Sequence, residues 1–290
     1  MASLKEIRAR IVSVASTQKI TSAMKMVSAA KLKKAESTTL SFVPYKNKLS
    51  EALSNYLGSL EGEVNIPLAE NREVKKVALI AFSSSSGLCG VYNSSICKLF
   101  KQAYDEYTGK LGKENVMVFL SGKKVKDYVK KLQIPVEQYY EPASDKPAYD
   151  FAMELSDKMV KLFLEHEVDR VEMIYNHYNS AGVQIPQREA VLPLRTDTLP
   201  TAQSIDYLVE PNKEDFIHAL VPKVVRTVFY SIMLDTFTAE HGARMTAMHI
   251  ASDNANQLSQ ELTIQYNKAR QDVITNELID IVGGAEALNG

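Results

Sequence analysis

The loop Ser83–Gly90, with the sequence SSSSGLCG, contains the residues of this chain best suited by type and spacing to a chemical site. It lies between a candidate strand and a candidate helix, where glycine-rich loops hold phosphate groups in nucleotide-binding folds. The loop lacks the three-glycine spacing of a dinucleotide fingerprint. Elsewhere, the Gly122-Lys123 pair would match a Walker loop only if the residue five positions before Gly122 were glycine, and that residue is Met117. The pattern therefore favours a structural turn that uses the conformational freedom of glycine over a nucleotide site.

The other residues that carry chemistry are scattered along the chain. Five histidines form neither an HExxH motif nor a cluster with cysteine, so we expect no metal site and no cofactor. There is no GxSxG motif of the kind that presents a nucleophilic serine. Cys89 and Cys97 are the only cysteines, too few for a disulfide framework, and we expect both to be structural thiols in a reducing cytoplasm.

Charge is unevenly distributed, although the whole chain carries a net charge of only −1. Residues 1–40 hold eight Lys/Arg against two Asp/Glu, a net +6, whereas residues 210–290 hold six against eleven, a net −5. Two helices of opposite charge can lie side by side, but two solvated helix faces fit the same pattern. The basic cluster Lys25, Lys31, Lys33 and Lys34 has no aromatic residues beside it that could stack on bases. A solvated helix face, or contact with an acidic protein surface, is therefore favoured over nucleic-acid binding.

Hydropathy gives no sign of membrane insertion. No run approaches the roughly 18 apolar residues of a membrane span, and the start MASLKEIRAR lacks the apolar core of a secretory signal. An Arg-rich transit peptide is not evident either, because the helical pattern begins at once. These features predict a chain without a membrane span and without a leader.

The two ends of the chain predict long helices. Ser3 and Glu6 have the spacing of a capping box, and no proline falls in residues 1–43 or 223–290. A helix running from about residue 215 to the end would be roughly 100 Å long, twice the diameter of a compact domain, so we expect it to protrude and to need a partner. The apolar seam expected on the first helix is Leu4, Ile7, Ile11 and Val14, shifting to Ile20, Met24 and Val27.

The middle of the chain, from about Val74 to Pro200, alternates short β-rich runs with amphipathic stretches. This alternation predicts an α/β domain with a mainly parallel sheet. The expected strands are Val77–Phe82, Val116–Ser121, Arg170–Tyr178 and Val183–Leu194, and the expected helices are Asn93–Tyr107, Lys123–Gln133 and Pro147–His166. The stretch Thr227–Phe237 reads as strand on propensity alone, although tertiary context can override that preference.

Three segments together resemble the γ subunit of F-type ATP synthase, of the bacterial type. They are Ile7–Leu32, similar to the family's N-terminal helix, Ser83–Ile96, similar to its strand-to-helix loop, and Ala243–Leu258 continuing through Tyr266–Leu288. The loop usually reads SDRGLCG in that family, and here Ser85 and Ser86 replace the Asp and Arg.

The resemblance implies a non-catalytic rotor. Residues 1–73 and 205–290 would form an antiparallel coiled-coil shaft, and residues 74–204 a Rossmann-like α/β domain at its foot. The shaft would stand inside a ring of alternating α and β subunits, with the ε subunit and the membrane c-ring at the foot. Rotation of the c-ring, driven by protons, would turn the shaft and change the nucleotide affinities of the β subunits. The implied location is the cytoplasmic side of the bacterial inner membrane, as a peripheral protein.

The match also assigns expected contacts residue by residue. Those expected at the β subunit are Met24, Lys25, Arg244, Gln271 and Thr275. The apolar bearing at the top of the ring is expected at Ile279, Val282 and Leu288, and the contact near the c-ring at Tyr207 and Glu210. Ordinary coiled-coil surface or seam is the alternative for each. The resemblance also implies no thiol switch, because Cys89 belongs to the GLCG motif rather than to the regulatory segment of plastid members.

Two other functions stay open on the sequence alone. One is a coiled-coil scaffold unrelated to ATP synthesis, which would associate with itself through exposed seams. The other is a small-molecule enzyme built on the α/β domain at the GLCG motif, which would bind a nucleotide without partners.

Overall fold

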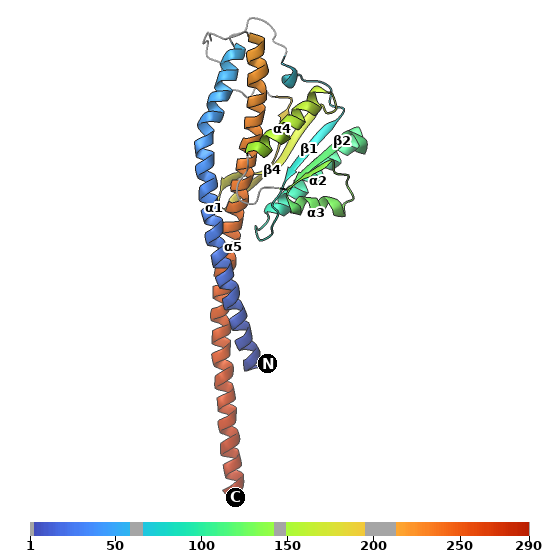
Figure 1. The fold of residues 1–290 in the computed structure, drawn as a ribbon. Coiled ribbons are helices and arrows are strands. Elements are labelled where there is room, and N and C mark those ends of the chain that lie inside the picture. The colour runs from blue at the N-terminus through green and yellow to red at the C-terminus, as the bar shows by residue number, and fades with distance from the viewer. Residues whose placement is uncertain (1–2, 59–65, 142–148, 195–212, 290) are drawn as a thin grey trace. The chain divides into compact units, whose positions relative to one another are not determined.

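The computed structural model describes residues 3–58, 66–141, 149–194 and 213–289. Its five strands are β1 Val77–Phe82, β2 Val116–Ser121, β3 Gln138–Tyr140, β4 Arg170–Ser180 and β5 Val183–Leu192. Its helices are α1 Leu4–Gly58, α2 Tyr92–Leu111, α3 Lys123–Lys131, α4 Tyr149–Leu164 and α5 Lys213–Asn289, with short 3-10 turns at Pro67–Ala69 and Lys113–Asn115. Figure 1 shows these elements along the chain.

Contacts between Cα atoms divide the chain into two units. One unit contains residues 28–244, and the other contains residues 1–27 and 245–290. Both long helices cross this boundary, so each unit receives part of α1 and part of α5. The three-part division expected from the sequence follows secondary structure rather than these contacts, and it stays a prediction.

The larger unit is built on a five-stranded sheet with the order β3-β2-β1-β4-β5. The pairs β1·β2, β1·β4 and β2·β3 are parallel, whereas β4 and β5 form an antiparallel hairpin. The expected mainly parallel sheet is therefore confirmed, with an antiparallel edge. Strands β1 and β2 have their predicted bounds, because both are continuous apolar runs that the sheet buries on its two faces.

Alternate residues of β1 supply two separate cores. Leu79 belongs to a cluster with residues of α2 and α3 on one face of the sheet. Ile80 belongs to a second cluster on the other face, with residues of α4 and the first part of α5. This two-sided burial follows from the period of two along a strand, and it makes an α/β sandwich of the larger unit.

The stretch Thr227–Phe237, which has strand-like propensity, is helical and lies within α5. Its apolar side chains pack on the sheet: Phe229 is fully buried and Ile232 is 4% exposed in the same cluster as Ile80. Packing of one helix face against the sheet therefore decides the conformation here, whatever the local propensity favours.

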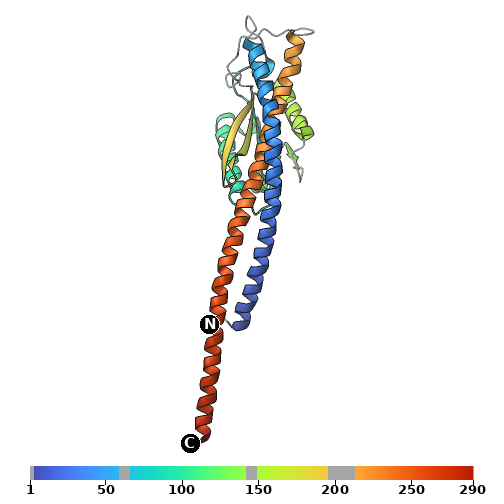
Figure 2. The ribbon, with the colours of Figure 1, turned by 90° about the vertical axis from the view of Figure 1, so that its left-hand side faces the viewer.

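The smaller unit pairs the start of α1 with the later part of α5 (Figure 2). The capping box forms as predicted, since the Ser3 backbone N–H donates to the Glu6 carboxylate at 2.9 Å and the Glu6 N–H donates to the Ser3 hydroxyl at 3.3 Å. The covered face of α1 begins with the predicted apolar residues, of which Ile7 is 7% exposed.

The predicted shift of the α1 seam to Ile20, Met24 and Val27 is wrong at its first and last residues, whereas Met24 is half-buried. Ile20 is 60% exposed and Val27 is 58% exposed. The covered positions instead keep the three-and-four spacing of the first turns, and they continue through Gln18, Thr21, Lys25, Ser28, Leu32 and Ala35. The seam therefore keeps its spacing, and because polar side chains occupy its middle, a search for apolar residues alone cannot follow it.

Candidate functional site

The loop after β1 is held where the carboxyl ends of two parallel strands meet. The Ser83 hydroxyl accepts a hydrogen bond of 2.9 Å from the Val125 N–H in the first turn of α3. Gly122, at the end of β2, has φ +96°, and a Cβ placed there would lie 2.0 Å from the Ser83 carbonyl oxygen. Only glycine allows this close approach of the two strand ends.

Other polar groups of the loop bond within the loop and to the start of α2. The Ser84 N–H donates to the Asn93 side-chain oxygen at 3.0 Å, and the Asn93 amide donates to the Cys89 sulfur at 3.0 Å. A bound phosphate would need free N–H donors of this kind. The Ser84 N–H is a donor of this kind and is already paired with Asn93, which favours the structural turn over the nucleotide site.

The loop is tied to α5 through Arg244. This guanidinium donates to the Ser86 hydroxyl at 2.8 Å and forms an ion pair of 2.8 Å with Glu240, one helical turn before it. A weaker contact of 3.4 Å joins Arg244 to the Nδ1 atom of His241. Arg244 is 7% exposed, so most of its hydrogen-bonding capacity is directed into the chain itself.

Burial controls the charge states in this cluster. It raises the pKa of Glu240, while the positive charges of Arg244 and Lys31 act in the opposite direction. Burial, together with the nearby positive charges of Arg244 and Lys31, lowers the pKa of His241 to about 4. His241 is therefore neutral at pH 7. The cluster holds one ion pair beside an uncharged imidazole.

The sequence identified Arg244 but missed its partners. Glu240 and Arg244 have the four-residue spacing of a helical ion pair, which is a signal that the sequence carries. Ser86 lies 158 residues from Arg244, and no local spacing indicates that contact.

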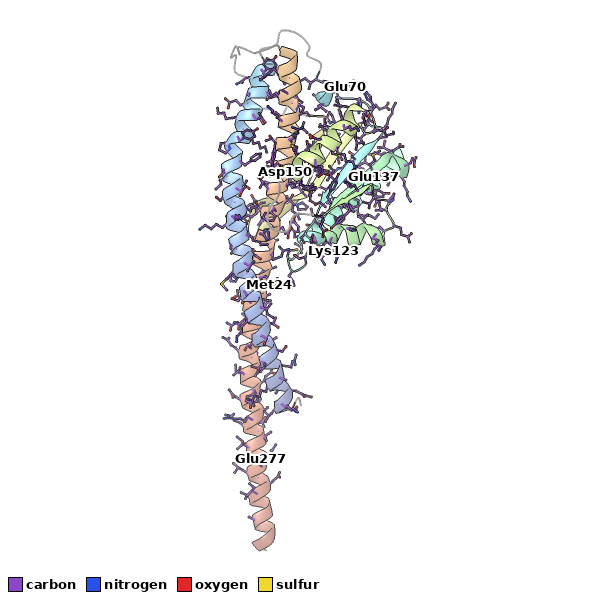
Figure 3. The ribbon with its side chains drawn as sticks, in the orientation of Figure 1. Met24, Glu70, Lys123, Glu137, Asp150 and Glu277 are labelled. Carbon is purple, nitrogen blue, oxygen red and sulfur yellow. The ribbon has the colours of Figure 1, made fainter. Side chains whose placement is uncertain are left out.

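The expected contact residues of α1 lie in the smaller unit. Met24 (labelled in Figure 3) and Lys25 are both half-buried. The Lys25 ammonium lies 3.2 Å from the Nδ1 atom of His249 on α5. His249 in turn lies 3.3 Å from the Asp253 carboxylate.

The expected contact residues in the last part of α5 lie on a solvent-exposed stretch of the helix. The side chains of residues 270–285 are all exposed, including Gln271 and Thr275, which are one turn apart on one face. Ile279 is 61% exposed and Val282 is 58% exposed. Figure 3 shows Glu277 on this stretch, which extends past the N-terminal end of α1.

Three expected contact residues fall outside what the structure describes. The side chain of Leu288 is not among the described side chains, although its backbone belongs to α5. Tyr207 and Glu210 lie in residues 195–212, outside the described residues. Their roles stay predictions.

The two cysteines are buried, as the sequence suggests for structural thiols. Burial raises the pKa of Cys97 to about 11, which keeps it protonated at neutral pH. Among the described residues, no group of three or more His, Cys, Asp or Glu could hold a metal ion. No helix in the described part of the chain is long and apolar enough to cross a membrane.

Comparison with known proteins gives matches along nearly the whole chain. A family described as ATP synthase matches residues 3–288. The ATP synthase gamma chain of Flavobacterium johnsoniae is 48% identical over 100% of both chains. That of Bacteroides fragilis strain ATCC 25285 is 47% identical over 99% of this chain and 100% of its own length.

Solved structures share the fold at lower sequence identity. A chain in the mitochondrial ATP synthase of Euglena gracilis, in a structure of its OSCP, F1 and c-ring, superposes with a TM-score of 0.68 and 18% identity. It covers 98% of this chain and 94% of its own length. A chain in the central stalk and c-ring of the Tetrahymena thermophila mitochondrial enzyme gives a TM-score of 0.59 and 22% identity, covering 80% of this chain and 99% of its own length. The family match and the full-length relatives together show that the chain belongs to the ATP synthase family, among the gamma chains.

Proposed function

We propose that this chain is the central-stalk rotor subunit of an F1Fo ATP synthase. In this role it couples proton-driven rotation of a membrane c-ring to conformational change, and hence to ATP synthesis, at the β subunits. The chain itself would be non-catalytic. The similarity to gamma chains over the full length supports the assignment to this subunit.

The solvent exposure of residues 270–285 of α5 is the observation that carries the proposal. Six large apolar residues between Val273 and Val282 are 40% to 68% exposed there. A row of such exposed side chains is unfavourable in water and calls for a protein partner. A ring of α and β subunits that encloses this stretch supplies one.

The proposed mechanism depends on differential contact. A shaft shifts the β subunits between open and closed states only if its contacts with the two states differ in free energy. The polar pair Gln271 and Thr275 would engage one β loop from a single helix face. Met24 and Lys25 would make a second contact from α1. An asymmetric set of contacts gives each β subunit a different nucleotide affinity at any moment.

Arg244 would act on the β contact indirectly. Its guanidinium is nearly buried and is bonded to Ser86, so we propose that it holds the Ser83–Gly90 loop in position. The bearing would consist of Ile279, Val282 and Leu288, whose apolar side chains fit a hydrophobic socket.

The remaining partners follow from the same assignment. The foot would contact the c-ring through Tyr207 and Glu210, with the ε subunit beside it. The chain would be a peripheral membrane protein on the cytoplasmic side of a bacterial inner membrane. Its relatives at 47% and 48% identity are bacterial gamma chains, which supports this location.

Reconstitution tests the proposal. The α and β subunits from the same organism are purified and mixed with or without this chain, and complex formation and ATP hydrolysis are measured. We expect a stable complex containing one copy of the chain and faster hydrolysis than α and β alone. A chain that associates only with itself, and leaves hydrolysis unchanged, would indicate a scaffold instead.

A further inference from the structure

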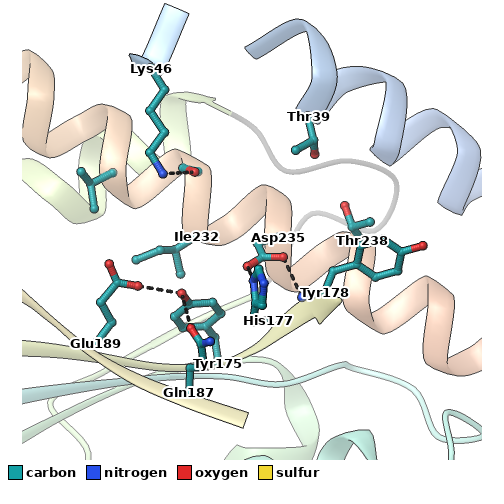
Figure 4. Close-up of a pocket in the computed structure, with 12 residues that line it drawn as sticks. Thr39, Lys46, Tyr175, His177, Tyr178, Gln187, Glu189, Ile232, Asp235 and Thr238 are labelled. Carbon is teal, nitrogen blue, oxygen red and sulfur yellow. Dashed lines mark hydrogen bonds and ion pairs between the residues drawn. The ribbon is translucent and has the colours of Figure 1, made fainter. Parts of the chain in front are cut away.

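A cavity of about 340 Å³ lies within the larger unit, where three segments distant in sequence come together. One wall comes from α1, one from α5 and one from the β4–β5 hairpin (Figure 4). This volume falls within the range of small-molecule pockets, roughly 300 to 1,000 Å³. The rotor role proposed above makes no use of this cavity.

The charged groups around the cavity leave an excess of negative charge. Glu189 and Asp235 contribute carboxylates, and Lys46 contributes the single lysine or arginine charge of the lining. The Lys46 ammonium already donates to the Ser231 hydroxyl at 3.1 Å. The formal charges of Lys46, Glu189 and Asp235 sum to −1, which favours a cation.

The two carboxylates differ in how many hydrogen bonds they already accept within the chain. Asp235 accepts a hydrogen bond of 2.8 Å from the Tyr178 N–H and lies 2.6 Å from His177, so it holds the hairpin against α5. Glu189 is exposed, and its Oε2 atom accepts a hydrogen bond of 2.7 Å from the Tyr175 hydroxyl. A carboxylate has about four acceptor positions, so Glu189 keeps acceptor capacity for a ligand.

The tyrosine beside Glu189 remains a donor. Burial raises the pKa of Tyr175 far above its ordinary value, and the Glu189 carboxylate raises it further. The hydroxyl therefore keeps its proton at all physiological pH values and fixes one side of the carboxylate. Figure 4 shows Tyr175 and Glu189 joined in this way at one side of the cavity.

Apolar surface completes the lining. Ile232 and Val228 of α5 face the cavity together with the Tyr175 side chain. On the α1 wall, the Thr39 hydroxyl is buried and has no hydrogen-bond partner among the described residues. A ligand that suits this lining has one positive group and a short apolar body.

We propose that this cavity binds a small organic monocation, a primary amine with an aromatic or branched aliphatic body. The ammonium group would donate to Glu189, and the apolar body would pack on Ile232 and Val228. Nucleotides and other phosphates are disfavoured because they would bring several negative charges to a lining that is already negative. The inference goes beyond the rotor function and does not depend on it.

Binding to the full-length chain tests the proposal, with three probes that share a phenyl group and differ in charge. These are 2-phenylethylamine, the neutral 2-phenylethanol and the anionic 3-phenylpropionate, each titrated by ligand-observed NMR and calorimetry. We expect the amine to bind at least tenfold more tightly than the other two. Equal affinity for all three probes, or preference for the anion, would overturn the proposal.

Two variants with opposite expected effects locate the site. Glu189→Gln should weaken amine binding about tenfold, since it removes the negative charge that receives the ammonium group, whereas Lys46→Met should tighten it several-fold by removing a competing positive charge. Glu137→Gln, at an exposed carboxylate away from the cavity, is the control and should leave binding unchanged. Circular dichroism melting confirms that each variant is folded. Amine binding that responds equally to Glu137→Gln and Glu189→Gln, or that weakens in Lys46→Met, would contradict the site.

Discussion

Arg244 on α5 donates a hydrogen bond of 2.8 Å to the hydroxyl of Ser86, 158 residues earlier in the chain. This contact joins the loop after β1 to the long C-terminal helix. The Ser86 hydroxyl gives the nearly buried Arg244 guanidinium a neutral acceptor.

Replacing Ser86 with alanine should loosen this connection. The Arg244 guanidinium would lose one acceptor while keeping its ion pair with Glu240, so we expect a loss of about 1 kcal/mol in the free energy of unfolding. Urea denaturation of the full chain measures the change. Ser85→Ala, at an exposed neighbouring position, should stay within about 0.5 kcal/mol of the original chain. Equal losses in the two variants would show that the Ser86 contact contributes nothing.

Gly122 tests the close approach between the ends of β1 and β2. Alanine there would place a Cβ 2.0 Å from the Ser83 carbonyl oxygen at φ +96°. The conformation alone costs about 1 to 3 kcal/mol for a residue with a side chain, and relieving the overlap adds to this. We therefore expect Gly122→Ala to lower the unfolding free energy by at least about 2 kcal/mol.

Gly87 is the matched control for that substitution. A Cβ at Gly87 meets no atom within 4 Å, so Gly87→Ala should change stability by less than about 0.5 kcal/mol. If denaturant midpoints fall equally for both glycines, the strand-end contact is not what Gly122 provides.

The elements that could be predicted are those fixed by neighbouring residues in the sequence, and the elements that were missed depend on contacts with distant segments. Strands β1 and β2 were predictable to the residue, because a continuous apolar run between turns has one simple interpretation. The edge strand β3 was missed, because Gln138–Tyr140 is too short for a recognisable pattern and exists through its pairing with β2.

The long helices show the same limit. Their existence followed from the absence of proline and the apolar spacing, but α5 also passes through Pro222, before the proline-free stretch. The covered face of α1 could not be followed through Gln18, Thr21 and Lys25, because these residues are polar and a hydropathy pattern does not identify them as covered. Likewise Arg244 could be identified by resemblance, whereas its contact with Ser86 depends on the fold that brings them together.

His241 should make stability depend on pH. Its pKa is lowered to about 4 in the folded chain, whereas it is near 6.5 when the chain is unfolded. Between these values the unfolded state binds more protons, so the contribution of His241 is fully present above pH 6.5 and is lost as the pH falls toward 4. The slope from this group approaches about 1.4 kcal/mol per pH unit.

The variant His241→Gln isolates that contribution. Unfolding free energies are measured for both chains between pH 4 and 8, and the difference between the two curves removes every other titrating group. We expect the original chain to lose stability more steeply below pH 6.5 than the variant. Parallel curves would mean that His241 titrates normally in the folded chain.

Gln271 and Thr275 test the proposed contact with the β subunit. The double variant Gln271→Leu with Thr275→Val removes polar groups that are exposed in the chain alone, so its own stability should hardly change. Loss of coupling worth about 1 to 3 kcal/mol should slow ATP turnover of the reconstituted complex by fivefold or more. The double variant Thr263→Val with Gln265→Leu makes the same chemical changes elsewhere on α5 and should leave turnover near normal. Unchanged turnover in the first variant would remove both residues from the mechanism.

The most direct measurement of the central claim is rotation of single reconstituted complexes. The complex is fixed to a surface through its β subunits, and a probe is attached to the α/β domain of this chain, at an exposed site on α3. We predict stepwise rotation of the probe in one direction when ATP is added, and no rotation when ATP is withheld. A complex that hydrolyses ATP while the probe stays still would contradict the rotor function.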